Sequence, residues 1–477
     1  MKLKGVFLIV YIGLTLIMFI TFKASLLVFT SFFFSAIFLF LITIYHLYYE
    51  KVYSPFLSSF IVFSFLFFLA APISQINSFD GLETPKFVNF FPYDEYLVLY
   101  ANILVSLFNV VFIFAYIYMK KTIKNYVPKP INLVQQKYLP FTILIILLLC
   151  FIIFITSYNF VEIEFSRPGW VKSSSSIGVL LIWKKLLFMI PFAGIILCFQ
   201  YLRKEKKRRV NIVNILLFCF LFFILLLWFK NPFTEKRNAL GPIYLSLIFL
   251  VFPKFFNSNL KTISFLFFIM IIVFPLSAIV THSDASFLEI YNNPFILIEQ
   301  MKGGGISEAF NTLNYDAFSN IMATIDYVYK FGFSYGYQLI GGLLFFIPRI
   351  IWVDKPYSTG QAVGEHLISD FGFNFSNLSN PLVSESFVNF GILGVIIVPI
   401  ILAFTFIKMI KWLQSNDYLK KIMAFYFAMH LIFLLRGDFT NGFSYYIGPL
   451  VSVVFLPKLI EIFTKQYLSY ANKKSNK

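Results

Sequence analysis

The sequence predicts an all-α membrane protein with about twelve transmembrane helices and one large outer loop. Hydrophobic residues make up 59% of its 477 residues, and charged residues only 13%. Soluble domains carry about 25% charged residues, so a water-soluble fold would leave too much apolar surface uncovered. Apolar runs of roughly 20 residues, the length that crosses a bilayer, recur along the chain. We therefore expect lipid to be the solvent for most of it.

Twelve apolar runs are candidate spans. The first lacks a small-residue cleavage site and is followed at once by another apolar run, so we interpret it as a span and not as a signal peptide. The eighth run is short, which leaves eleven spans as an alternative. The runs cover residues 5–22, 26–48, 55–75, 96–119, 138–157, 177–200, 211–229, 239–253, 261–281, 386–408, 419–436 and 442–463.

The distribution of charge predicts the orientation of these spans. Cytoplasmic loops of membrane proteins carry an excess of Lys and Arg. With the N-terminus in the cytoplasm, the basic groups at 120–137, 203–209, 408–421 and 465–477 all fall on that side. Acidic residues then gather on the outer side. We expect a multi-pass protein of the bacterial inner membrane with both termini in the cytoplasm, and we attribute the net charge of +17 to orientation, not to nucleic-acid binding.

One segment is too long for a simple connection between helices. Residues 282–385 form an outer loop, and loops of this length are usually functional. The predicted organisation is spans one to nine in 1–281, this periplasmic or extracellular loop, and spans ten to twelve with a cytoplasmic tail in 386–477. Within the loop, 316–331 shows helical periodicity, which predicts an amphipathic helix able to lie in the membrane interface. Residues 339–347 are apolar but too short to span, which favours a re-entrant or interfacial piece.

Three arginines stand at outer-side edges of apolar runs. They are Arg237 before the eighth span, Arg349 after Pro348, and Arg436 at the end of the eleventh span. The planar guanidinium keeps its charge and suits bidentate phosphate recognition. A single such residue is more often an arginine that reaches to the interface or pairs with a local acid, as Arg237 would with Glu235. Three on one face favour a phosphorylated lipid substrate.

Candidate proton-transfer groups share this side. They are His366, Glu385, Asp438, and His282 with Asp284. A carboxylate or imidazole within hydrogen-bond reach of a hydroxyl can act as a general base. Each alone is more often a solvated loop residue, but Glu385 directly precedes the tenth span.

Several classes of chemistry lack their signatures. The three cysteines lie inside apolar runs, and no CxxC pair, HExxH or phosphate-binding Gly-rich loop occurs. We therefore expect no metal and no cofactor. Acidic residues are nearly absent from the spans, which disfavours an ion-coupled transporter.

The loop and the following span carry a family resemblance. The residues are Pro348-Arg349, Trp352 and Lys355-Pro356, then Glu385 followed by Asn389-Phe390-Gly391 and Gly394. This pattern resembles the Wzy-type oligosaccharide repeat-unit polymerases of O-antigen and capsule. The Lys236-Arg237 pair and Arg436-Gly437-Asp438 are also similar to that family. In motif terms the resemblance covers about residues 230–450.

The resemblance implies a glycosyltransferase reaction. A glycan on an undecaprenyl pyrophosphate carrier is transferred onto the next lipid-linked repeat unit at the outer face of the membrane, and undecaprenyl pyrophosphate leaves. Arg237, Arg349 and Arg436, with Lys355 and Asp438, would bind the substrate. Glu385 or His366 would act as base, and Trp352 and Tyr357 would stack on sugars. Implied partners are membrane lipids, a chain-length regulator and a flippase.

Three alternatives remain at this point. An O-antigen ligase uses the same donor but a different acceptor. A lipid-linked oligosaccharide flippase would show an internal repeat and a charged central cavity, and neither is evident. A structural partner without activity would use the outer loop only for docking.

Overall fold

The predicted all-α fold class is confirmed. The computed structural model describes residues 2–123, 126–127, 138–165, 181–204, 209–232, 234–274, 287–293 and 310–475. These residues form helices and their connections, and the β pairing among them is one isolated bridge between Lys86 and Pro92.

The helices are long and apolar enough for a multi-pass membrane protein. Two shorter apolar helices, Arg237–Val251 and Asn259–Val273, lie where the eighth and ninth spans are predicted. In the described part of the chain, ten further helices meet the length and hydropathy of a membrane span: Lys2–Ile20, Leu26–Tyr49, Pro55–Asn77, Glu95–Ile123, Leu139–Phe165, Ile182–Arg203, Ile212–Phe229, Leu382–Leu413, Tyr418–Arg436 and Phe439–Tyr467.

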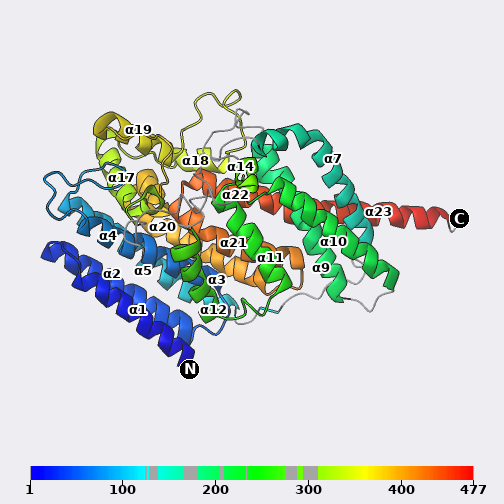
Figure 1. Ribbon diagram of the computed structural model, residues 1–477, viewed down its shortest axis with the longest axis horizontal. Helices are drawn as coiled ribbons and strands as arrows, with labels where there is room; N and C mark the ends of the chain where they lie inside the picture. The colour runs from blue at the N-terminus through cyan, green and yellow to red at the C-terminus, as the bar shows by residue number, and fades with distance from the viewer. Residues whose placement is uncertain are drawn as a thin grey trace.

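Figure 1 shows how the helices are arranged. The helices of the outer-loop segment, α17, α18 and α19, gather at the edge of the molecule opposite the N-terminus. In chain order the helices are α1 (Lys2–Ile20), α2 (Leu26–Ile44), α3 (Pro55–Phe65), α4 (Ala71–Asn77), α5 (Glu95–Lys120), α7 (Leu139–Phe165), α9 (Ile190–Lys204), α10 (Arg209–Phe229), α11 (Arg237–Val251), α12 (Asn259–Phe268), α14 (Phe287–Asn292), α17 (Ala317–Phe331), α18 (Tyr337–Leu343), α19 (Thr359–Phe371), α20 (Leu382–Leu413), α21 (Tyr418–Arg436), α22 (Phe439–Leu450) and α23 (Leu456–Ser475).

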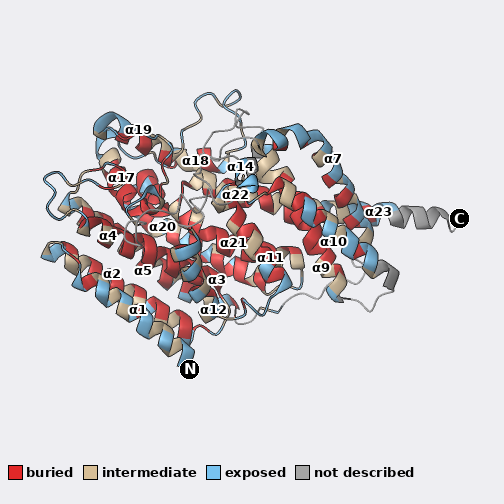
Figure 2. Cartoon of the chain, viewed as in Figure 1, coloured by how far each residue is buried: buried red, intermediate tan, exposed pale blue. Residues whose placement is uncertain are grey.

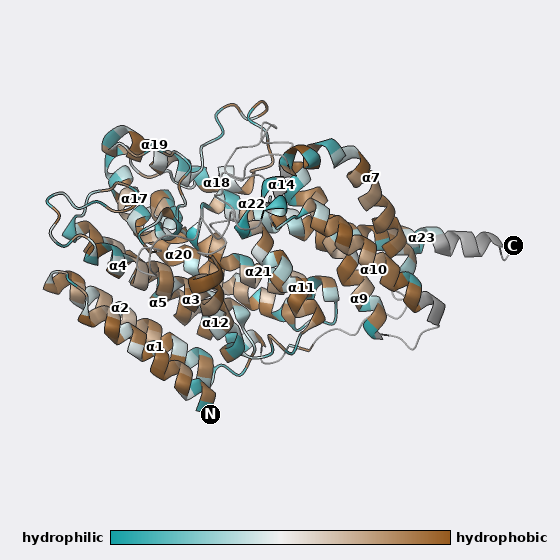
Figure 3. Ribbon diagram, viewed as in Figure 1, coloured by the Kyte–Doolittle hydropathy of each residue, from teal (hydrophilic) through white to brown (hydrophobic). Residues whose placement is uncertain are grey.

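Burial separates a central group of helices from a peripheral one. The most apolar stretch of Pro55–Asn77 is 100% buried inside the protein, whereas that of Lys2–Ile20 is only 11% buried. Figure 2 shows the exposed faces of α1, α2, α7 and α10, and Figure 3 shows that these faces are apolar. Apolar side chains that no protein element covers are suited to contact with lipid tails. The helix that begins at Pro55 is accordingly an inner helix, enclosed by its neighbours.

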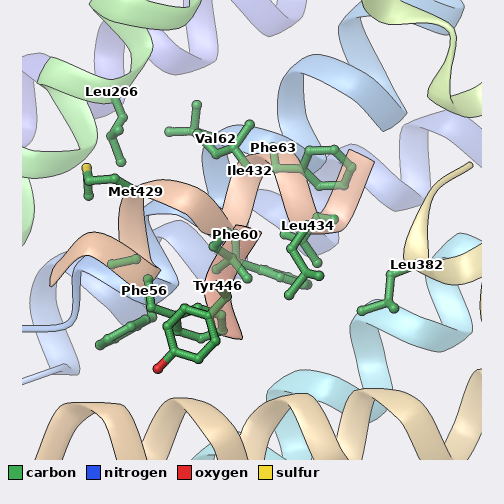
Figure 4. Packing of buried hydrophobic residues seen from close by; sticks show 14 of the residues in the cluster. Phe56, Phe60, Val62, Phe63, Leu266, Leu382, Met429, Ile432, Leu434 and Tyr446 are labelled. Carbon is green, nitrogen blue, oxygen red and sulfur yellow. The ribbon is translucent and has the colours of Figure 1, made fainter. Parts of the chain in front are cut away.

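The centre of the fold is the contact between α3 and α21. Figure 4 shows aromatic residues of α3, including Phe56 and Phe60, packed among apolar side chains that include Met429 and Ile432 of α21. Ser54 caps α3, and Pro55 follows in the first helical position, where its missing N–H costs nothing. The Ser59 hydroxyl donates to the Ala428 carbonyl of α21 at 2.7 Å. Small hydroxyl residues of this kind let membrane helices approach closely and bond to one another.

A buried polar network fastens one end of α2, α3 and α5. The Glu50 carboxylate accepts from Tyr116 and Lys120 at 2.5 and 2.8 Å and contacts His46 Nδ1 at 2.5 Å. The other ring nitrogen of His46 lies 2.7 Å from the Ser58 hydroxyl. Buried charges are tolerated when they are paired and hydrogen-bonded. This network therefore joins the ends of three helices near Lys120.

The predicted amphipathic helix exists as α17, but its expected environment is wrong. Phe318 and Ile325 are buried as the periodicity predicts, yet Asn320 on the supposed polar face is also fully buried and Tyr329 is exposed. Asn320 bonds to Asn89 and to the Ser379 carbonyl. The helix is inserted between α5, α19 and α20 and does not lie free in the interface. Its polar residues pair inside the protein, which the periodicity of the sequence cannot show.

The tenth span begins at Leu382, not at residue 386, and it is broken. Phe390 and Gly391 have non-helical backbone angles, and Gly391 adopts φ +59° and ψ −142°. That region of backbone space is open essentially to glycine alone. Glu385 therefore lies inside a short helical segment, residues 382–389, which is separated by the break from the long membrane-crossing part. The Asn389-Phe390-Gly391 motif is the break itself.

The outer loop satisfies backbone groups near this break. The Ser334 N–H donates to the Val388 carbonyl at 2.9 Å, and the Ser334 hydroxyl donates to Asn389 Oδ1 at 3.0 Å. Asn389 in turn donates to the Glu385 carbonyl. A carbonyl without a partner at membrane depth costs several kcal/mol, so these bonds allow the helix to break where it does.

The apolar piece predicted at 339–347 is a short helix and a series of turns. Helix α18 ends at Leu343, and Ile340, Leu343 and Phe346 are exposed. Its seven residues are too few to cross a bilayer, as expected. Helix α18 packs against α22 and α20, so this apolar edge is fixed beside the start of α22.

Replacing Gly391 with alanine should destabilise the protein by about 1–3 kcal/mol, because alanine does not tolerate that backbone conformation. A Cβ there would also meet the Phe333 ring at 3.1 Å. Thermal unfolding of the purified protein in detergent measures the effect. Gly13→Ala in α1 is the control, since a Cβ at Gly13 meets nothing within 4 Å. Equal unfolding temperatures for the two variants would contradict the role assigned to the break.

Candidate functional site

Glu385 is the centre of a buried cluster at the junction of the outer loop with α20 and α22. Its Oε2 accepts from the Thr359 hydroxyl at 2.6 Å. Its Oε1 accepts from the backbone N–H of Phe439 at 3.0 Å. The side chain is 2% exposed. Three elements far apart in the sequence therefore converge on one carboxyl group.

Asp438 is the second carboxylate of this cluster. Its Oδ1 caps α22 by accepting from the Asn441 N–H at 3.3 Å, and its Oδ2 accepts from the Gly360 N–H at 2.9 Å. Asp438 interacts electrostatically with Glu385. A Cβ at Gly360 would meet the Leu378 carbonyl at 2.1 Å, so only glycine fits between Leu378 and Asp438.

Two helix N-termini face this pair of carboxyl groups. Phe439, which donates to Glu385, is the first residue of α22, and Gly360, which donates to Asp438, is the second residue of α19. A helix N-terminus carries roughly half a positive charge and unpaired N–H groups. The two helices thus stabilise negative charge where two neighbouring acids would otherwise repel each other.

A chain of polar side chains links the carboxyl cluster to the break in α20. Thr359 lies 3.0 Å from Gln338 Oε1, and Ser334 lies 3.4 Å from the same oxygen and 3.0 Å from Asn389. A movement of the break would therefore change the hydrogen bonds available to Glu385. Thr359, Gln338 and Ser334 were not predicted as site residues, because nothing in the sequence shows that they meet Glu385.

Arg237 and Arg436 lie together around residues 313–316. Arg237 donates to the Phe274 carbonyl at 2.7 Å and to Asn314 Oδ1 at 3.2 Å. Arg436 donates to the Leu313 carbonyl and pairs with Asp316 Oδ1 at 3.1 Å. The two guanidinium groups repel each other electrostatically. This is the concentration of positive charge that the sequence predicts, although only two of the three arginines are brought together.

Both members of the Arg436–Asp316 contact are largely buried. Burial raises the pKa of Asp316 above its ordinary value, although Arg436 opposes that effect. Arg436 Nε is buried and has no hydrogen-bond partner in the described part of the chain. The guanidinium therefore keeps one donor for a further acceptor.

Arg349 and Lys355 fold the loop after α18. Arg349 donates to the carbonyls of Lys355 and Pro356 and lies 4.4 Å from the centre of the Tyr357 ring. Lys355 Nζ donates to the carbonyls of Leu344, Phe345 and Ile347, just past the end of α18. Partial burial, with the charge of Arg349, lowers the pKa of Lys355. One lysine ammonium group thus satisfies three carbonyls of the turns that follow α18.

The two predicted sugar-stacking residues also lie in this loop. Trp352 is half-buried and packs edge-on against Tyr337, whose hydroxyl donates to the Asp354 carbonyl. Tyr357 is exposed except where Arg349 covers it. Tyr357 therefore retains more open ring surface than Trp352.

His366 lies apart from Glu385, in the contact between α17 and α19. Its Nε2 is 2.8 Å from Asp326 and its Nδ1 is 3.3 Å from Asp370, which also pairs with Lys330. The pKa of Asp370 is lowered, chiefly because Lys330 donates a hydrogen bond to its carboxylate. The ring is buried among Tyr327, Phe331 and Phe371. These contacts join two helices of the outer loop.

The suggested pairing of Arg237 with Glu235 is wrong. Glu235 instead pairs with Lys184 at 3.1 Å and Lys230 at 3.3 Å, and Lys184 also pairs with Glu164. Burial opposes ionisation of Glu235, but Lys230 and Lys184 lower its pKa overall. In the sequence, Glu164 lies in one connection, Lys184 in the sixth predicted span, and Lys230 with Glu235 in a later connection, so their meeting is a tertiary effect.

The remaining candidate proton-transfer groups, His282 and Asp284, lie outside the described residues. Across the ranges that the structure describes, no three His, Cys, Asp or Glu side chains are placed to hold a metal ion.

A family model matches residues 365–467 of the chain. It is that of the O-antigen polysaccharide polymerase Wzy. The resemblance seen in the motifs is thereby confirmed over this segment, and the match supports a general role as an O-antigen repeat-unit polymerase. No curated protein and no solved structure matches the chain.

The Wzy segment, residues 365–467, contains part of the candidate site. Glu385, Asp438 and Arg436 lie within it, as does His366, whereas the other substrate-binding candidates precede it. The carboxyl cluster is therefore the part of the site that coincides with the family match.

Replacing Arg436 with methionine should destabilise the fold by about 3 kcal/mol, because it leaves the buried Asp316 carboxyl without its ionic partner. Adding Asp316→Asn in the same chain should restore much of the loss, since the unpaired carboxyl is then gone. Denaturant unfolding of the two variants and the wild type measures both steps. A double variant no more stable than Arg436→Met would show that the pairing is not the source of the effect.

Proposed function

We propose that this chain polymerises lipid-linked oligosaccharide repeat units at the outer face of the bacterial inner membrane. The observation that carries the proposal is Glu385, held by the Thr359 hydroxyl and the Phe439 N–H inside the Wzy segment. A buried carboxylate fixed by two donors keeps one orientation, which a general base requires. The proposed donor is the growing glycan on undecaprenyl pyrophosphate.

The proposed reaction is a displacement at the anomeric carbon of the donor glycan. A hydroxyl at the non-reducing end of the incoming lipid-linked unit attacks that carbon and forms the new glycosidic bond. The bond from the anomeric carbon to the pyrophosphate oxygen breaks, and the leaving group takes the electron pair. Glu385 accepts the hydroxyl proton. The products are a glycan longer by one donor transfer, still on the acceptor's carrier, and free undecaprenyl pyrophosphate.

Arginine side chains are proposed to stabilise the leaving pyrophosphate. Negative charge develops on it as the bond breaks, and fixed cations in a site of low dielectric stabilise such charge strongly. Arg436 and Arg237 lie close enough to interact electrostatically, so their positive fields add at this point. Arg349 and Lys355 would contribute from the loop after α18, with Trp352 and Tyr357 at the sugars.

The choice between the two proposed bases favours Glu385. His366 has Asp326 and Asp370 as partners within the α17–α19 contact. Glu385 has Asp438 and two helix N-termini beside it. We therefore assign proton transfer to Glu385 and propose that Asp438 orients the start of α19 against it.

Glu385→Gln should slow polymerisation strongly, because the amide fills the same space but cannot accept the proton. General base catalysis contributes about 10²–10⁴-fold, so kcat should fall by that factor. The assay uses the purified protein with a synthetic undecaprenyl-pyrophosphate-linked repeat unit of the source strain and resolves product length on a gel. Glu365→Gln, an exposed residue of α19 that contacts Gln361, is the matched control and should keep its product ladder.

The same assay separates the alternatives. No ladder but transfer onto a lipid A core would assign the chain as a ligase. No transfer to either acceptor would overturn the enzyme assignment and favour a flippase or a structural partner.

Arg349→Ala should weaken binding of the donor. The change removes one cation and frees the carbonyls of Lys355 and Pro356, so donor binding and loop shape both suffer. We expect a higher KM for the donor, by roughly 10-fold or more for one lost charge-assisted bond. Initial rates against donor concentration measure it, and an unchanged KM would remove Arg349 from the proposed site.

A further inference from the structure

Among the described residues, the ammonium group of Lys185 is in contact with neutral groups. Lys185 lies in a π-helical turn, η4 (Leu181–Leu186), which is joined to α9 by the 3-10 turn Leu187–Met189. Its Nζ donates to the Ser444 hydroxyl at 2.5 Å and stands 4.2 Å from the centre of the Tyr445 ring. Within the described ranges, no Asp or Glu oxygen lies within ion-pair distance of it. A hydroxyl and an aromatic face are neutral partners, so neither of these contacts neutralises the charge of Lys185.

The neighbouring lysines differ in this respect. Lys184 pairs with Glu164 at 2.7 Å and with Glu235 at 3.1 Å. Lys230 pairs with Glu235 and also donates to the Lys184 carbonyl. Two of three adjacent ammonium groups are thus held by carboxylates. Among the described residues, the acids of this region, Glu164 and Glu235, pair with Lys184 and Lys230 and not with Lys185.

The position of Lys185 is fixed by close packing against α22. A Cβ at Gly448 would meet the Lys185 carbonyl oxygen at 2.4 Å, so the two backbones touch there. The Ser452 hydroxyl donates to the next carbonyl, that of Leu186, at 2.6 Å. The ammonium is therefore presented by a rigid contact and not by a mobile surface side chain.

Lys185 faces the same carboxyl cluster as the proposed site. It interacts electrostatically with Lys236 and Lys230, which repel it, and with Asp438, which attracts it. Lys236 is exposed and directly precedes Arg237. The field of Lys185 therefore reaches Asp438 from η4, an element that does not itself form the carboxyl cluster.

We propose that Lys185 binds a phosphate oxygen of the lipid diphosphate donor. This inference rests on the proposed function, which supplies the diphosphate. A half-buried cation without a counter-ion is costly, and an anionic ligand removes that cost. Phosphate oxygens accept short charge-assisted hydrogen bonds, and lysine serves phosphate as a point charge. Lys185 then stabilises the diphosphate from η4, in addition to the arginines Arg237 and Arg436.

Direct binding tests the inference without requiring turnover. The purified full-length protein in detergent is titrated with undecaprenyl pyrophosphate, and the dissociation constant is measured for wild type, Lys185→Met, Lys185→Arg and Lys184→Met. One charge-assisted bond corresponds to roughly a 10- to 100-fold weakening for Lys185→Met. Lys185→Arg should retain most of the affinity. Lys184→Met makes the same charge change one residue away and should bind as the wild type does.

The outcomes separate this inference from the proposed function. Wild-type affinity in Lys185→Met overturns the inference, whether or not the protein polymerises. Weakened binding in Lys185→Met, with an unchanged unfolding temperature and with Lys185→Arg intact, supports it, even if polymerisation fails and the proposed function falls. If phosphatidylglycerol competes with the diphosphate equally well at Lys185, the site holds a phospholipid headgroup and the donor assignment is overturned.

Discussion

The structure depends on one interrupted membrane helix. In a bilayer each backbone N–H and C=O needs a partner, so a helix can break only where other protein groups take over its lost bonds. At Phe390–Gly391 these groups come from Ser334 and Asn389. The loop that contains Ser334 is thus attached to α20 by the hydrogen bonds that replace those lost at the break. The short segment before the break holds Glu385 at an angle that lets it reach both Thr359 and Phe439.

Electrostatic compensation around this point uses backbone as much as side chains. Two carboxyl groups lie side by side, and the N-termini of α19 and α22 both point at them. Lys185 interacts electrostatically with Asp438, and among the described residues neither it nor Arg237 or Arg436 forms an ion pair with the two carboxyl groups. Charge of both signs is therefore kept apart by packing. Cations and carboxyl groups that are not paired with each other can bind the phosphate and hydroxyl groups of one ligand.

Hydropathy predicted the membrane helices because the requirement for about 20 apolar residues is local in sequence. The start that hydropathy predicted for α20, at residue 386, lies after the observed start at Leu382. The segment 382–389 ends at a break in the backbone and not at a loss of apolar character, so hydropathy does not show it as a separate segment. Helical periodicity found α17, but not its burial. Asn320 looks like a solvent residue until its partners Asn89 and Ser379 are brought against it by the fold.

For the candidate site too, the sequence indicated some residues but not their contacts. Glu385 and Asp438 stood out from the sequence because acids are rare at the ends of spans. Their contacts with Thr359 and Gly360 join segments that lie tens of residues apart, and no local pattern encodes them. Lys184 and Lys185 were equivalent in sequence, and only the tertiary structure shows that one is paired and the other is not.

The close approaches at glycine also bear on how such a chain can evolve. A Cβ at Gly394 would meet the Ser386 carbonyl at 2.0 Å, and one at Gly360 would meet the Leu378 carbonyl at 2.1 Å. Backbone cannot move aside as a flexible side chain can, whereas a cation that faces a phosphate can be supplied from several elements. Across divergent relatives, the spacing of these glycines should therefore persist after the positions of the arginines and lysines have drifted. Searches for distant homologues gain most from the residues that have no side chain.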